Sequence, residues 1–75
     1  SDMLARKVVK MLASHDAEPD VDIANAAVWQ WAAERGIDAD LEPGLIAAGE
    51  MGWIEDGKRP GTIRLTHSGH LAARS

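Results

Sequence analysis

The spacing of apolar residues predicts that most of this chain is helical. Leu4, Val8, Met11 and Leu12 recur at helical spacing, and the basic residues among them fall on the opposite face. This pattern is typical of an amphipathic helix. We therefore expect a first helix over residues 3–14, followed by a break at residues 15–20.

A second helix is expected to run as far as Arg35. Asp20 or Asp22 would cap its first turn, and Gly36 would end it in the left-handed conformation, with Ile37 packing back. A stripe at helical spacing would face the core. Its expected members are Ile23, Ala24, Ala27, Val28 and Trp31.

Two tryptophans lie on opposite faces of this second helix. Projected at ~100° per residue, Trp31 falls in the middle of the apolar stripe and is expected to anchor the core. Trp29 falls almost opposite, flanked by Ala26 and Ala33. Two explanations of Trp29 stay open: an interface with a partner or a second copy, or burial beneath the N-terminal loop or the last helix.

A third helix is expected to end near Met51, with Gly52 as its stop. Asp38 or Asp40 would cap it, and Pro43 would lie in its first turn. Two glycines inside it each cost about 1 kcal/mol relative to alanine, so each indicates close packing or a functional need for space. These are Gly44 and Gly49, and the expected apolar side consists of Leu41, Leu45, Ile46 and Ala48.

The rest of the chain is expected to form a hairpin and a short helix. Two apolar runs, residues 53–55 and 62–65, flank a loop that contains Asp-Gly and Pro-Gly turn signals. Thr66 would cap a last helix over residues 67–74. The predicted fold is mainly α with a small antiparallel β-hairpin, in a single domain over residues 1–75.

Composition adds constraints on stability and location. The 75 residues contain no cysteine and 45% apolar residues, many of them alanine, so the three tryptophans are expected to carry much of the core. No apolar run approaches the ~20 residues of a membrane span, and no signal peptide is visible. We expect a cytoplasmic protein, with Ser1–Asp2 derived from an expression tag and Met3 as the natural start.

Charge is segregated along the chain. Residues 1–15 carry a net charge of +2, residues 16–56 carry −10, and residues 57–75 carry +4. Basic ends could form a local positive face on an acidic protein, although uneven charge is also common by chance.

Nothing in the sequence predicts an enzyme or a cofactor. There is no glycine-rich phosphate loop, and His67 and His70 are too few for a metal site without further ligands. We therefore expect no catalytic residues, no metal, no cofactor and no small-molecule substrate.

Two motifs resemble the winged helix-turn-helix family. Ala48-x-x-x-Gly52-Trp53-Ile54 is similar to the end of a recognition helix that turns into the first wing strand. Ile63-Arg64-Leu65-Thr66-x-x-Gly69 is similar to the segment that closes the wing. The resemblance spans nearly the whole chain. It implies three helices, a wing with its tip at residues 56–61, a short C-terminal helix, and a third helix that enters the major groove of DNA.

The expected third helix departs from this pattern in its charge. Residues 38–52 contain four acids and no Lys, Arg, Asn or Gln, so direct reading of bases by this helix is not expected. Phosphate contacts are expected instead from the wing and the first helix. The candidate DNA-contacting residues are Lys58, Arg59, Arg64, Arg6, Lys7 and Lys10.

Two functions follow as expectations. The first is a small DNA-associated, transcription-regulatory protein that contacts the backbone of double-stranded DNA through its wing, as a dimer. The alternative is a winged helix used for protein interaction, with the acidic third helix and Trp29 as contact surfaces.

Overall fold

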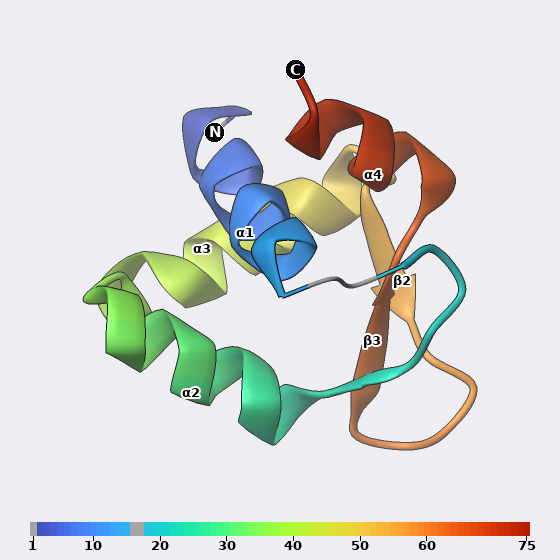
Figure 1. Ribbon diagram of the computed structural model, residues 1–75, viewed down its shortest axis with the longest axis horizontal. Coiled ribbons are helices and arrows are strands. Elements are labelled where there is room, and N and C mark those ends of the chain that lie inside the picture. The colour runs from blue at the N-terminus through green and yellow to red at the C-terminus, as the bar shows by residue number, and fades with distance from the viewer. Residues whose placement is uncertain (1, 16–17) are drawn as a thin grey trace.

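The computed structural model describes residues 2–15 and 18–75, so the expected tag residue Ser1 lies outside the described residues (Figure 1). The elements are α1 (Asp2–Ser14), β1 (Ile23–Ala24), α2 (Asn25–Arg35), α3 (Asp38–Glu50), β2 (Ile54–Asp56), β3 (Thr62–Leu65) and α4 (His67–Ala73). The helices dominate and the strands form one small antiparallel sheet in the order β1-β3-β2, which confirms a mainly α fold with a small antiparallel β element. In the described ranges, no helix is long and apolar enough to cross a bilayer.

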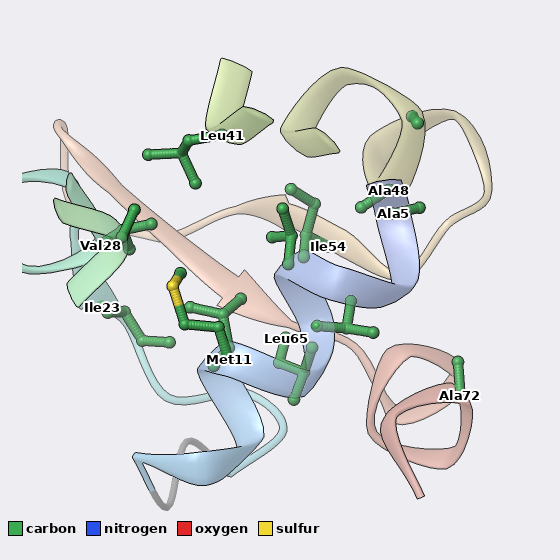
Figure 2. Close-up of a cluster of buried hydrophobic side chains, with 14 residues drawn as sticks. Ala5, Met11, Ile23, Val28, Leu41, Ala48, Ile54, Leu65 and Ala72 are labelled. Carbon is green, nitrogen blue, oxygen red and sulfur yellow. The ribbon is translucent and has the colours of Figure 1, made fainter. Parts of the chain in front are cut away.

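Helix α1 runs through the middle of the fold and supplies much of the core. Val8, Met11 and Leu12 of its predicted apolar face are fully buried, whereas Leu4 is half-buried. Figure 2 shows Leu65 and Ile54 beside the α1 ribbon, with Leu41 and Val28 on the side of α3 and α2. Every helix and strand contributes at least one residue to this single buried cluster. The buried residues of α1 are Ala5, Val8, Val9, Met11 and Leu12.

The contact between α1 and α3 depends on a glycine. A Cβ at Gly44 would lie 2.5 Å from Val8 Cγ2 and 2.9 Å from the Leu4 carbonyl oxygen. The close packing predicted for Gly44 is therefore confirmed. A Cβ at Gly49 would meet nothing within 4 Å, so packing does not explain Gly49.

The second helix begins later than expected. Ile23 and Ala24 form β1, where Ile23 pairs with Ile63 of β3, and α2 starts at Asn25. No side chain caps this helix, so the cap predicted for Asp20 or Asp22 is wrong. The reason is non-local, because pairing with β3 holds the segment extended. The predicted C-terminal stop is confirmed, since Gly36 has φ +72°.

The tryptophans lie at the margin of the core, so the prediction that they carry much of it is wrong. Trp31 is half-buried and stacks on His15 with the ring centroids 4.0 Å apart. Trp53 is half-buried with the Arg6 guanidinium 5.3 Å from its ring centroid. Trp29 is 45% exposed. Aliphatic residues fill the interior instead; the largest fully buried side chains are Met11, Leu12, Leu41, Leu65, Val8, Val9 and Val28.

Helix α3 differs from its prediction at the start and agrees at the end. Its N-cap is Ile37, with no side-chain hydrogen bond, so the caps predicted for Asp38 and Asp40 are wrong. Pro43 lies inside the helix beyond the first turn. Gly52 has φ +74° and follows the last turn, as predicted.

Candidate interaction surface

The loop between β2 and β3, residues 57–61, is fastened to the segment before β1 by one carboxylate. The backbone amides of Lys58 and Arg59 each donate to an oxygen of Asp22 at 3.2 Å. A Cβ on Gly57 would collide with the Thr62 hydroxyl and the Asp22 carboxylate. Asp22, predicted as a helix cap, therefore satisfies the donors of this loop instead.

Arg64 completes this network from β3. Its Nη2 donates to Asp22 Oδ1 at 2.8 Å, and a second acid, Asp20, lies 3.6 Å from its Nη1. Only 12% of the Arg64 side chain and 11% of the Asp22 side chain are exposed. The hydrogen bond from Arg64, aided by the two loop amides, holds the pKa of Asp22 below its ordinary value, although partial burial opposes this.

This network predicts a stability that depends on pH. Because folding lowers the pKa of Asp22, the stabilisation is complete well above the ordinary value of 3.8 and is lost as the pH falls below it. We expect Asp22→Asn to lower the thermal midpoint at pH 7 by on the order of 5 °C. The difference between the variant and the parent should shrink as the pH falls below that ordinary value, because the parent carboxylate then becomes protonated as well.

Asp20→Asn is the matched control for that measurement. The Asp20 side chain is 80% exposed and 3.6 Å from Arg64, so its removal should change the midpoint little. Equal effects of the two substitutions, or a difference that persists unchanged at low pH, would contradict the assigned role of Asp22.

The predicted DNA-contacting residues fall into three groups. Arg64 is held by Asp22 and Asp20 and is largely withdrawn from solvent. Lys58 and Arg59 lie exposed on the loop, and 75% of the Arg59 side chain is exposed although it lies 3.6 Å from Asp22. Two cations are thus presented at the tip of the hairpin.

The third group, on α1, does not extend that tip. Arg6 pairs with Asp2 at 3.2 Å, and Lys7 pairs with Asp40 of α3 at 3.1 Å. Lys10 donates to the carbonyl oxygen of Ser75 at 2.9 Å, beyond the end of α4. Figure 1 shows the β2–β3 loop at the far end of the hairpin from α4, so Lys10, which contacts the chain beyond α4, lies away from this loop.

The solvent face of α3 is apolar and acidic. Ile46 is 58% exposed, and Glu42 and Glu50 are exposed on the same helix. Ile46 was predicted to face the core with Leu45, which is half-buried; this prediction is wrong for Ile46. At ~100° per residue Ile46 lies about 140° from the fully buried Leu41, so the helical projection could have excluded it from the stripe.

A groove runs between this face and the hairpin. We call it the α3–β2 groove; its volume is about 380 Å³. Gly49 lines it on the helix side, where a missing side chain leaves open space. Glu55 and Asp56 line the groove on the strand side, so its apolar walls lie next to two negative charges. The groove is lined by Leu45, Ile46, Gly49, Ile54, Glu55, Asp56 and Ile63.

A separate exposed patch lies on α2. Trp29 is 45% exposed, and Ala26 and Ala33 are also exposed at positions on the same flank. Because so much of Trp29 is exposed, the described residues do not bury it, and the explanation that placed it beneath the N-terminal loop or the last helix is not supported.

The two histidines of α4 differ in environment. His67 is exposed, while His70 is half-buried and its Nδ1 has no hydrogen-bond partner within the described part of the chain. Across residues 2–15 and 18–75, no group of three or more metal-ligating side chains comes together.

Comparison with known protein families, with curated proteins and with solved structures finds no match for this chain.

Proposed function

We propose that this chain is a winged-helix domain that binds another protein through the α3–β2 groove. The order of elements, and a sheet in the order β1-β3-β2 whose last two strands form the hairpin, support the assignment to the winged helix. In such a domain α3 would be the recognition helix, and the tip of the wing, expected at residues 56–61, would be the loop at residues 57–61 that follows Asp56 of β2.

The single observation that carries the proposal is the chemistry of the face between α3 and the hairpin. A DNA-reading surface presents cations and amides to phosphates and base edges. This face instead exposes Ile46 and Gly49 beside Glu55 and Asp56. Carboxylates at that position would repel phosphates, whereas an apolar groove with a charged rim is typical of protein interfaces.

Selection of binding peptides tests this proposal. A random peptide library displayed on phage and selected on the folded chain should return peptides that lose at least about tenfold in affinity, or 1.4 kcal/mol, when Ile46→Asp is introduced. A carboxylate on the groove wall would be desolvated beneath an apolar ligand. Because Ile46 is 58% exposed, the fold should tolerate the change.

Two control variants locate the site. The double variant Lys58→Ala, Arg59→Ala should bind the selected peptides as the parent does, because both cations lie on the loop beyond the groove. Trp29→Ala should also bind them normally. Peptides that are indifferent to Ile46→Asp would refute the proposal, and dependence on Trp29 would move the interface to α2.

Binding to the DNA backbone is the second candidate, favoured by the exposure of Lys58 and Arg59 at the hairpin tip. If DNA is bound, a mobility shift with mixed genomic fragments at ~50 mM salt should be lost in the double variant Lys58→Ala, Arg59→Ala. The salt dependence should correspond to about two phosphate contacts. No shift at that salt concentration would eliminate this candidate.

A further inference from the structure

Strand β2 has one edge with which no strand of residues 2–15 and 18–75 pairs. The sheet order places β3 between β1 and β2, so β2 is an edge strand. The Gly57 amide donates to the Thr62 carbonyl at 2.9 Å, and the Thr66 amide donates to the Trp53 carbonyl at 2.9 Å.

These bonds determine which backbone groups of β2 face outward. Residues of an antiparallel pair alternate between hydrogen-bonded and non-hydrogen-bonded positions. Residue 57 forms a hydrogen-bonded pair with residue 62, and residue 53 forms one with residue 66. Glu55 and Arg64 lie midway between these pairs and are therefore also a hydrogen-bonded pair. Ile54 and Asp56 therefore direct their amides and carbonyls away from β3, towards the open edge.

The α3–β2 groove adjoins this edge. Side chains alternate between the two faces of a strand, so Ile54 and Asp56 share a face, and both line the groove. A chain added beside β2 would lie about 4.8 Å from it. Every second side chain of that chain would then point towards the space over Gly49, where a Cβ would meet nothing within 4 Å.

The charges at the edge select the occupant. Glu55 and Asp56 are exposed, and no described residue forms an ion pair with either. A second copy of β2 would bring the same acids into opposition, and like charges directly across a strand pair are destabilising. A segment that carries Lys or Arg would be attracted instead.

We propose that the partner of the α3–β2 groove is an extended, basic segment of another protein that adds to the free edge of β2. This inference rests on the proposed function and specifies its ligand: apolar residues alternate with Lys or Arg. The outward groups of Ile54 and Asp56 provide main-chain hydrogen bonds, and the groove accepts the apolar side chains. The basic side chains, on the opposite face, lie on the side of Glu55, and Asp56 adds negative potential at the groove.

Designed peptides test the mode of binding. The probe is a nine-residue peptide of alternating valine and lysine, titrated into the isotope-labelled chain to ~1 mM while amide chemical shifts are recorded. We expect the largest shifts at Ile54 and Asp56. Glu55→Gln with Asp56→Asn should weaken binding at least threefold, and Ile46→Asn, which removes an apolar wall without adding charge, should weaken it at least tenfold.

Methylation of peptide nitrogens is the matched control. In an added strand, only alternate amides donate to β2. Of two peptides, one methylated at every valine nitrogen and one at every lysine nitrogen, one should lose binding at least tenfold and the other should keep it. Both carry the same charges, so non-specific attraction to an acidic chain would not distinguish them.

The outcomes separate the inference from the proposed function. Equal affinity of the two methylated peptides, or a preference for a helical peptide of the same composition, would overturn strand addition and leave the groove as a protein-binding site. The absence of any shift along β2 with the valine–lysine peptide would overturn the inference. The proposed function fails separately, if the displayed library yields no peptide that depends on Ile46.

Discussion

Gly44→Ala should destabilise the fold by about 2–3 kcal/mol, although alanine is the better helix former. The added methyl group would lie 2.5 Å from Val8 Cγ2 and 2.9 Å from the Leu4 carbonyl oxygen. The side chain of Val8 could rotate, but the Leu4 carbonyl belongs to the backbone of α1, so α1 must move away from α3. That movement would loosen the contact between α1 and α3.

Gly49→Ala is the matched control, five positions along the same helix. Nothing lies within 4 Å of the new methyl group, so the variant should be as stable as the parent or more stable by about 0.5 kcal/mol. Urea unfolding followed by circular dichroism measures both changes. Similar effects of the two substitutions would show that helix propensity, and not the α1–α3 contact, determines the result.

Gly69→Ala is expected to cost about 3 kcal/mol or more, a large part of the stability of a domain of this size. A Cβ at this position of α4 would collide with the carbonyl oxygen of Trp53. That same oxygen accepts a hydrogen bond from the Thr66 amide at 2.9 Å. The new methyl group on the α4 backbone would collide with the backbone of Trp53, and no side-chain rotation can relieve this contact. Helix α4 would therefore have to move away from the base of the hairpin.

Ser68→Ala is the control for this second substitution. Ser68 is the preceding residue of α4 and is exposed, so its replacement should change the unfolding midpoint little. If Gly69→Ala melts within a degree or two of Ser68→Ala, the close approach of α4 to Trp53 does not contribute as described.

These glycines and their neighbours give the two sequence motifs a structural reason. The Thr66 hydroxyl accepts from the Gly69 amide at 3.0 Å and donates to the Gly52 carbonyl at 2.6 Å. Thr66 therefore caps α4, as predicted, and also links it to the end of α3. The Thr-x-x-Gly spacing closes the hairpin base without involving any ligand.

Local signals predicted most of the fold correctly. The apolar spacing of α1, the left-handed Gly36 and Gly52, and the Thr66 cap all depend on residues within one or two turns. Such signals are readable from one sequence because their partners are close along the chain.

The errors arose where partners are distant in the sequence. Asp22 resembles a helix cap, but its acceptor oxygens serve Lys58 and Arg59, which lie 36 and 37 positions away. Likewise, Ile23 and Ala24 fit the apolar stripe of a helix in the sequence, but in the structure they pair with β3 as a strand. Strand pairing of this range leaves no local pattern.

The candidate surface was predictable only in part. The acidity of α3 was visible in the sequence, and it already argued against base reading. The groove was not visible, because it requires Ile46 and Gly49 of one element to face Ile54 and Asp56 of another. Charge segregation also could not reveal that Lys7 and Lys10 contact α3 and the chain beyond α4.

The pairing of β1 with β3 also bears on how the chain reaches its native state. Ile23 meets Ile63, so the central strand of the sheet is joined to its first neighbour only when residues far apart have come together. Helical turns form in about a microsecond, whereas closing so long a segment costs entropy before any contact is gained. The first three helices can therefore begin to form during synthesis. The pairing of β1 with β3 can form only after residues 54–65 of the hairpin have been synthesised.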